Sequence, residues 1–277
     1  MKAALLQITA SDQPDDNLQM LRGMVRDAAA QGAGFVLTPE VSNCVSTSRS
    51  HQEAVLEPEE GNTFLAGMIE EARAQGVWLL LGSIGVKTGD ADGRFANRSF
   101  LISPQGEIAG WYDKIHMFDV DVSETETYRE SAGYRPGDRA VVADAGFARI
   151  GMSICYDLRF ARLYRVLAHA GAQILTVPAA FSPVTGAAHW ESILRARAIE
   201  TGCFVLAPAQ CGTHAASTGK QRSTHGHSLV VAPWGEVLLD AGTEPGVYCV
   251  DLDMAAVAEA RRRVPSLTHD REFTLDQ

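Results

Sequence analysis

The chain has 277 residues, of which 46% are hydrophobic and 21% charged, as in an ordinary globular protein rather than a disordered one. Its formal net charge of -10 disfavours nonspecific binding to nucleic acid or anionic membranes, because the summed field repels polyanions. The five cysteines form no C-x-x-C pair, which favours reduced thiols in the cytosol, and no apolar run reaches the roughly 18 residues of a membrane-spanning helix. We therefore expect a cytoplasmic protein with a small-molecule partner and without nucleic-acid or membrane partners.

Short runs of β-forming residues alternate with apolar residues at helical spacing along the whole chain. The predicted strands cover residues 3–9, 34–38, 77–84, 149–154, 173–178 and 203–208, and the predicted helices lie around residues 18–25, 64–74, 163–170 and 190–199. The second half thus repeats the plan of the first. This order of elements indicates an α/β fold.

A matching pair of hairpins strengthens the sign of an internal repeat. Residues 99–108 and 228–237 align without a gap, and each is a strand, a Pro-x-Gly turn and a returning strand. We infer two β-sheets related by a pseudo-two-fold repeat, packed face to face with helices outside, which is a four-layer α-β-β-α sandwich. Since no Pro/Ser-rich linker divides the halves, residues 1–277 are interpreted as a single domain with a polar C-terminal tail from about residue 266.

The first candidate for chemistry is Cys155, where an apolar strand runs directly into a polar turn and helix. Residues 151–160 read GMSICYDLRF. A thiol at such an elbow can have its pKa lowered from about 8.5 by nearby positive charge or a helix N-terminus, and backbone N–H groups beside it can receive an oxyanion. Taken alone, a free cysteine is more often a buried structural residue, so the rest of the chain has to decide between the two interpretations.

Two further segments end strands on charged residues. Glu40 follows the apolar strand FVLTP, at a position where open α/β sheets commonly carry catalytic groups, and it is a candidate base. Lys114 follows the aromatic run WYD and is a candidate cation for a developing oxyanion. A solvated acid and a surface salt bridge are the ordinary alternatives. Glu130, in the stretch Tyr128-Arg-Glu-Ser131, is by composition indistinguishable from a loop charge.

Together these segments resemble the nitrilase, or carbon–nitrogen hydrolase, superfamily over residues 3 to about 253. TPE at 38–40, DKIH at 113–116 and CYDLRF at 155–160 match its glutamate, lysine and nucleophile motifs in the right order. The resemblance implies an amidase with a catalytic triad of Glu40, Lys114 and Cys155, a thioester intermediate and no cofactor or metal. It also implies that Glu130 is an auxiliary second glutamate that helps to position the substrate.

Within the superfamily, residues 183–201, 209–214 and 225–235 are most similar to the deaminated glutathione amidase group. That similarity implies hydrolysis of an anionic amide that joins a 2-oxoglutarate-type acyl group to Cys-Gly. The backbone N–H of Tyr156 is expected to stabilise the oxyanion. Because guanidinium groups bind carboxylates bidentately, cationic side chains near these motifs are candidates for substrate binding, and the full candidate set is Tyr156, Arg159, His189, Arg195 and Arg197.

Other interpretations remain open at this stage. An omega-amidase that acts on 2-oxoglutaramate or related dicarboxylate monoamides would use the same catalytic residues. A metal site around His225 and His227, with Cys211 or His214, is conceivable but lacks a firm ligand spacing. A noncatalytic binding or scaffold protein on the same fold is the alternative from another class. The resemblance also implies a homodimer or a higher homo-oligomer.

Overall fold

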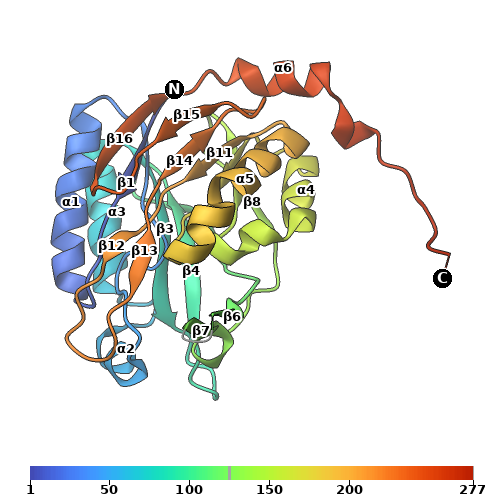
Figure 1. Ribbon diagram of the computed structural model, residues 1–277. Coiled ribbons are helices and arrows are strands. Elements are labelled where there is room, and N and C mark those ends of the chain that lie inside the picture. The colour runs from blue at the N-terminus through green and yellow to red at the C-terminus, as the bar shows by residue number, and fades with distance from the viewer. Residues whose placement is uncertain (124–125, 277) are drawn as a thin grey trace.

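A computed structural model describes residues 1–123 and 126–276, which form a layered α/β structure with two six-stranded sheets (Figure 1). In the first sheet β1, β2 and β3 run parallel, and the flanking strands pair with them antiparallel. Its strands, in spatial order, are β16 (Gly246–Asp251), β1 (Lys2–Gln7), β2 (Phe35–Leu37), β3 (Trp78–Lys87), β4 (Phe95–Ile102) and β5 (Ile108–Asp113).

The second sheet repeats the arrangement of the first. Three parallel strands, β9, β10 and β11, are again flanked by antiparallel ones. In spatial order the strands are β15 (Val237–Asp240), β14 (Leu229–Val231), β11 (Phe204–Ala207), β10 (Ile174–Thr176), β9 (Arg149–Met152) and β8 (Val141–Asp144). The two matching hairpins of the sequence are β4–β5 and β14–β15, so the predicted internal repeat is confirmed.

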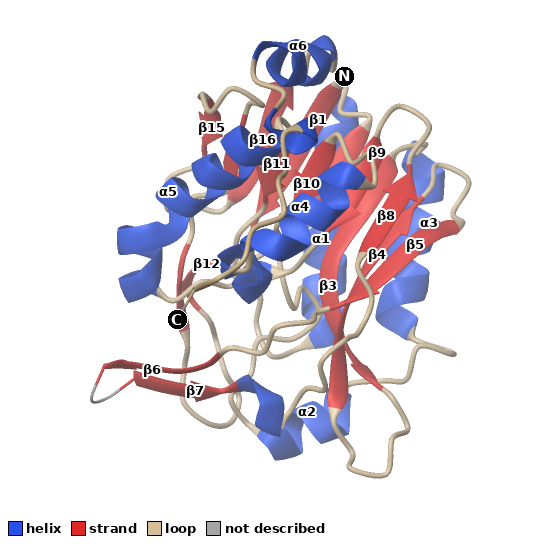
Figure 2. Cartoon of the chain, turned by 90° about the vertical axis from the view of Figure 1, so that its right-hand side faces the viewer, coloured by secondary structure: helices blue, strands red, loops and turns tan. Residues whose placement is uncertain are grey.

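Side chains on the two faces of the first sheet pack in different layers, as the period-2 geometry of a strand requires. In β1, Ala3 and Leu5 point into the core between the sheets, whereas Ala4 and Leu6 pack against the helices outside. Helices α1 (Pro14–Ala30) and α3 (Thr63–Gln75) cover the first sheet, and α4 (Ala161–His169) and α5 (Pro183–Thr201) cover the second (Figures 1 and 2). The α-β-β-α sandwich predicted from the sequence is confirmed.

Local sequence signals explain where α5 begins and ends. The side chain of Ser182 accepts a hydrogen bond from the backbone N–H of Thr185, and Pro183 occupies the first turn, where its missing N–H has no cost. The helix stops at Gly202, whose left-handed φ of 58° suits a residue without a Cβ. The helix therefore extends further at its N-terminal end than the residues 190–199 predicted from apolar spacing.

Short elements surround one end of the sandwich, and the last α-helix lies at the other end (Figures 1 and 2). The short elements are α2 (Arg49–Val55), the hairpin β6 (Asp119–Ser123) with β7 (Glu126–Arg129), the hairpin β12 (Cys211–Thr213) with β13 (Ser223–His225), and the 3-10 turns η1 (Glu130–Ala132) and η2 (Cys155–Arg159). After α6 (Ala255–Arg263) and η3 (Ser266–Thr268), the tail leaves the sandwich, as Figure 1 shows, while Asp270 pairs with Arg165 and His169 of α4. Within the described ranges, each helix is too short or too polar to cross a bilayer.

Candidate active site

Cys155 stands at a strained turn between β9 and the 3-10 turn η2. Its φ of 50° lies in the left-handed region, which is uncommon for a residue with a side chain and is typical of functional turns. Two hydrogen bonds hold this turn: the Cys155 N–H donates to the carbonyl of Pro178 at 3.0 Å, and the Ile154 N–H donates to Asp157 Oδ2 at 2.9 Å. The strand-to-turn position predicted for Cys155 is thus observed.

Asp157 connects the Cys155 turn to the lysine segment. Its fully buried carboxylate accepts hydrogen bonds from the hydroxyl of Tyr112 at 2.7 Å and from the backbone N–H of His116 at 3.0 Å, and Oδ1 also lies 2.7 Å from His116 Nδ1. The ring of His116 in turn stacks on Phe160, with centroids 3.5 Å apart. One buried carboxylate therefore braces both the nucleophile turn and the chain just after Lys114.

Glu40 follows β2 and is held by donors from three parts of the chain. Its Oε1 accepts from Lys114 Nζ at 2.8 Å and from the Asn97 side-chain amide at 2.9 Å, and Oε2 accepts from the Ala180 N–H at 2.9 Å. The turn that carries it lies close against β3: a Cβ on Gly82 would be 1.8 Å from the carbonyl oxygen of Thr38. The carboxylate is thus fixed in position by packing and by hydrogen bonds.

Lys114 lies between two carboxylates. Its side chain is only 1% exposed, and its Nζ lies 2.8 Å from Glu40 Oε1 and 2.8 Å from both oxygens of Glu130. Glu130 also accepts from the Phe118 N–H at 2.6 Å. The structure therefore brings together the four residues that the sequence singled out, although they come from four separate segments.

The charges of this cluster set the protonation of each group. Burial disfavours the ionised form of Glu40, but Lys114, with Arg222 further away, outweighs that effect, so the pKa of Glu40 lies below its usual value. Burial also acts against the charge of Lys114, yet Glu130 and Glu40 together raise its pKa well above normal. The site therefore holds an ionised glutamate and a permanent ammonium group.

The thiol behaves differently from the sequence-based expectation. Burial raises the pKa of Cys155 well above its usual value, and the neighbouring Glu40 carboxylate raises it further, more than Lys114 lowers it. The lowered pKa considered from the sequence was wrong, because burial and the Glu40 carboxylate together outweigh the positive charge of Lys114. A neutral thiol beside an ionised carboxylate has the arrangement of a nucleophile and its general base.

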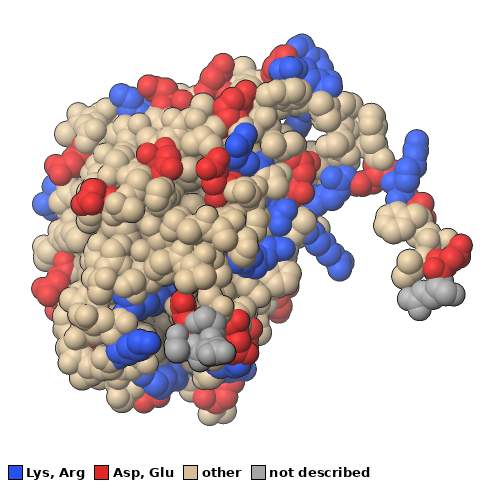
Figure 3. Space-filling view, viewed as in Figure 1, with Lys and Arg blue, Asp and Glu red and all other residues tan. Residues whose placement is uncertain are grey.

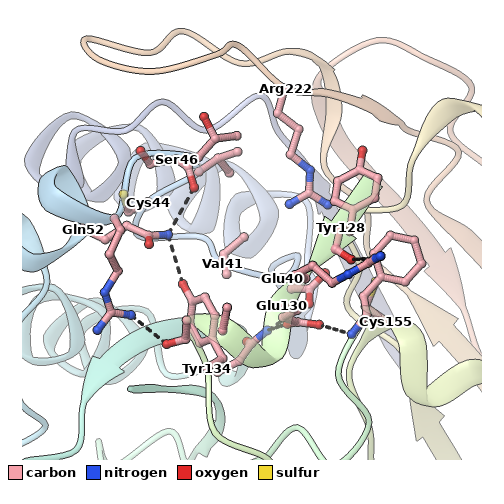
Figure 4. Close-up of a pocket in the computed structure, with 18 of the residues that line it drawn as sticks. Glu40, Val41, Cys44, Ser46, Gln52, Tyr128, Glu130, Tyr134, Cys155 and Arg222 are labelled. Carbon is pink, nitrogen blue, oxygen red and sulfur yellow. Dashed lines mark hydrogen bonds between the residues drawn. The ribbon is translucent and has the colours of Figure 1, made fainter. Parts of the chain in front are cut away.

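A pocket of about 470 Å³ opens onto this cluster (Figure 4). Its wall is built from residues of α2 and the loop before it, of the β6–β7 hairpin, and of the segment before β13. In Figure 4, Cys155, Tyr128 and Arg222 lie on one side of the pocket, and Gln52 and Tyr134 on the other. Arg222 was not among the residues predicted from the sequence, because it sits in a small polar loop without a periodic signal.

The substrate-binding candidates Tyr156, Arg159 and His189 lie outside the lining of this pocket. Tyr156 packs its ring against Phe118, which lines the pocket. Arg159 Nη2 lies 3.2 Å from Nδ1 of His189, an exposed residue at the start of α5. None of Tyr156, Arg159 and His189 belongs to the described pocket lining.

The two arginines of α5 that were candidates for substrate binding also lie outside the described pocket lining. Arg195 is exposed and donates to the Gly235 carbonyl and to Glu191. Arg197 is buried under Tyr164 and donates to the Leu158 carbonyl and to Glu200. Helical spacing directs these two guanidinium groups toward other elements, so the structure does not bring them to Cys155.

The histidines of β13 and its surroundings are satisfied by hydrogen bonds and packing. His214 uses both ring nitrogens, on the Ala10 carbonyl at 2.7 Å and the Thr224 hydroxyl at 2.8 Å. His225 and His227 stack with centroids 4.6 Å apart, and His227 pairs with Asp240. Among the described residues, His, Cys, Asp and Glu side chains form no cluster of three or more that could hold a metal ion.

Comparison with known proteins places these features in context. A family model described as carbon–nitrogen hydrolase matches residues 2–262. The chain is 38% identical to a deaminated glutathione amidase of Yersinia enterocolitica, covering 97% of this chain and 92% of that one, and 37% identical to the omega-amidase NIT2 of Mus musculus, covering 98% and 95%. The crystal structure of the C. elegans NitFhit protein superimposes with a TM-score of 0.88 at 30% identity, over 98% of this chain but 65% of that longer one.

Proposed function

We propose that this chain, which belongs to the carbon–nitrogen hydrolase family and is an amidase acting on non-peptide C–N bonds, cleaves deaminated glutathione to 2-oxoglutarate and Cys-Gly. The observation that carries the proposal is the buried group of Cys155, Glu40 and Lys114 at the floor of a 470 Å³ pocket, in a chain 38% identical to a deaminated glutathione amidase. A thiol, a base and a cation are the groups that thioester chemistry requires.

The first half of the proposed reaction forms a thioester. As Cys155 Sγ bonds to the amide carbon, Glu40 accepts the thiol proton, and the carbonyl oxygen becomes an oxyanion that faces Lys114 and the N–H of Tyr156. Within the described residues that N–H has no acceptor, whereas the Cys155 N–H is already bonded to Pro178. When the C–N bond breaks, the leaving amine takes the proton from Glu40, and the acyl group stays on sulfur.

The second half hydrolyses the thioester. Water adds to the acyl carbon while Glu40 takes one of its protons, and the C–S bond then breaks. The carboxylate product leaves, and the proton returns to Cys155. Glu130 supports both halves by holding Lys114 in place, since its two oxygens accept from Nζ at 2.8 Å.

The mechanism is tested by intact-protein mass spectrometry after brief exposure to deaminated glutathione. We expect a 2-oxoglutaryl adduct on the wild-type protein and neither adduct nor turnover in Cys155→Ala, with Cys203→Ala, a buried cysteine outside the pocket lining, as the matched control that keeps both. Unchanged turnover by Cys155→Ala would refute the mechanism. Absence of both adduct and turnover in the wild-type protein would instead reject deaminated glutathione as the substrate.

The second candidate substrate is 2-oxoglutaramate, favoured by the 37% identity to an omega-amidase. Because both amides leave the same acyl group, adduct mass does not separate them. Competition kinetics with the two amides in one reaction does: faster consumption of deaminated glutathione is expected, and the reverse order would make omega-amidase activity the function.

We extend the proposal to the cellular setting. Five free cysteines are consistent with a reducing cytoplasm, which a localised fluorescent fusion would test. A homo-oligomer is proposed from family resemblance, and light scattering of the purified protein at several concentrations measures its mass. A mass of about 30 kDa at every concentration would contradict it, since the chain is 29.8 kDa.

A further inference from the structure

The cations that line the pocket differ in how far their charge is already neutralised. Lys114 is shared between two carboxylates. Arg129 lies 2.8 and 3.0 Å from the two carboxylate oxygens of Asp121, and Arg49 donates to Glu53 at 2.9 Å and also to two backbone carbonyls. Within the described part of the chain, Arg222 is the pocket cation without a carboxylate partner.

Arg222 also carries a buried donor without an acceptor. Its Nη2 donates to the carbonyl of Ala180, but its Nε is enclosed by protein and has no hydrogen-bond partner among the described residues. A buried N–H without an acceptor is costly, and native proteins rarely leave one unless a ligand or water completes it. Its Nη1 also has no hydrogen-bond partner among the described residues, and an oxygen of the substrate is a suitable acceptor for that group, because Arg222 lines the same pocket as Cys155.

The position of Arg222 relative to the reacting groups is set through one residue, Ala180. The N–H of Ala180 donates to Glu40 Oε2 at 2.9 Å, while its carbonyl accepts from Arg222. The guanidinium also lies 5.7 Å from the ring centre of Tyr128, on the Cys155 side of the pocket in Figure 4. Arg222 is thus within reach of the acyl part of a substrate bound to Cys155, and the charge of its guanidinium already acts on the pKa of Glu40.

The loop that carries Arg222 is tied down on both sides. The backbone carbonyl of Arg222 accepts a hydrogen bond from the His214 N–H at 2.9 Å. Two residues earlier, the N–H of Lys220 donates to the Thr47 hydroxyl at 3.1 Å, and that hydroxyl donates back to the Lys220 carbonyl at 2.8 Å. A guanidinium held in this way loses little further freedom when it binds a ligand, which is what a specificity-determining residue requires.

Charge balance indicates what Arg222 binds. At the pocket floor two carboxylates, Glu40 and Glu130, face the single ammonium group of Lys114, so the floor carries net negative charge and repels an anionic substrate. We infer that Arg222 binds the free carboxylate at the far end of the acyl group, so that the pocket selects monoamides of dicarboxylic acids. This inference rests on the proposed function and deepens it, because deaminated glutathione and 2-oxoglutaramate share that carboxylate.

The space-filling surface agrees with this placement. Figure 3 shows several Lys and Arg side chains, with Asp and Glu side chains among them, on the lower part of the molecule, where Figure 1 places α2 and the β6–β7 hairpin, although the chain as a whole has a formal charge of -10. Local positive potential around a pocket in an acidic protein draws small anions toward it.

The test compares glutaramate with pentanamide, which has the same chain length but a methyl group in place of the carboxylate. Arg222→Met should lower kcat/KM for glutaramate about 100-fold, the effect of losing hydrogen bonds to a charged group, and change pentanamide turnover less than about threefold. Arg222→Lys keeps the charge but not the two-pronged geometry, so a loss of about tenfold is expected. Arg129→Met is the matched control, since Asp121 already neutralises that arginine, and both substrates should change less than about threefold.

The possible outcomes test the role of Arg222 separately from the proposed function. Equal losses on both substrates, or no loss on glutaramate, would overturn the assignment of Arg222 while leaving the proposed function intact. If the wild-type protein does not prefer glutaramate to pentanamide, the proposed function fails as well. Should Arg222→Met not fold, Arg222→Lys carries the comparison. Competitive inhibition of the wild-type protein by glutarate and by pentanoate gives the same contrast without turnover. Equal inhibition by the two acids would contradict the inference.

Discussion

Replacing Lys114 with methionine tests whether one ammonium group holds together two carboxylates, the buried Glu40 and the partly buried Glu130. The Lys114 Nζ lies 2.8 Å from Glu40 and from Glu130, and the side chain is almost fully buried. At that separation and an effective dielectric constant of about 20, Coulomb's law gives about 6 kcal/mol for each pair. Methionine preserves most of the volume and removes the charge, so the buried Glu40 and the partly buried Glu130 would face each other without the ammonium group between them.

The net effect on stability is smaller than the sum of the pair energies, because the variant no longer has to desolvate an ammonium group. Removing one partner of a buried ion pair typically costs about 3–5 kcal/mol, and we expect Lys114→Met to lower the free energy of unfolding by that amount at pH 7. Urea unfolding followed by circular dichroism measures it. The amidase activity of Lys114→Met should also fall by at least about 100-fold, since the oxyanion loses its cation.

The pH dependence gives an independent check with a defined sign. In the wild-type protein the pKa of Glu40 is lowered from 4.5, so its ionised form contributes stability above about pH 4.5 that is lost as the pH falls through the lower folded pKa. Without Lys114, burial raises the pKa of Glu40 instead, and the folded variant then binds a proton more readily than the unfolded chain. The stability difference between the two proteins should therefore shrink as the pH is lowered from 7 toward 4.5.

A double-mutant cycle with Glu130→Gln provides the control. Removing one of the two carboxylates should recover at least about 1 kcal/mol in the Lys114→Met background, although Glu130→Gln alone destabilises the wild-type protein. A loss below about 1 kcal/mol for Lys114→Met, or a double variant no more stable than the single one, would refute the argument that Lys114 neutralises both carboxylates.

Three further outcomes follow from the site. Because the pKa of Glu40 is lowered from 4.5, kcat/KM of the wild-type protein should stay level on acidification until below about pH 4.5 and then fall; an acid limb near pH 6 would contradict Glu40 as the ionised base. Asp157→Asn should lower the free energy of unfolding by about 2 kcal/mol in urea, because its buried donors lose a carboxylate acceptor, whereas the exposed control Asp138→Asn should change it by less than about 0.5 kcal/mol. Gly82→Ala should reduce activity and thermal stability together, since its Cβ would lie 1.8 Å from the Thr38 carbonyl, and wild-type values for both would show that the turn before Glu40 is adaptable.

Much of the fold could be predicted because its signals are local. Apolar strands, helical spacing and the repeated Pro-x-Gly hairpin indicated the α-β-β-α sandwich, and the described structure has all of them. The predictions missed α2 and the β6–β7 and β12–β13 hairpins, which are short and polar and owe their form to contacts with the rest of the chain. The strand β16 also joins the first sheet through β1, a pairing between the two ends of the described chain that no local pattern encodes.

The candidate site, too, was predicted in part from the sequence and decided in part by the tertiary structure. Glu40, Lys114 and Cys155 could be selected from the sequence because each stands at the end of a strand within a recognisable motif, and Glu130 because of family resemblance. Only the tertiary structure decided how burial and charge combine: burial and the Glu40 carboxylate raise the pKa of Cys155 by more than Lys114 lowers it. Only it showed that Arg222 reaches the pocket, since the electrostatics of a buried site depend on distances between segments that are remote in the chain.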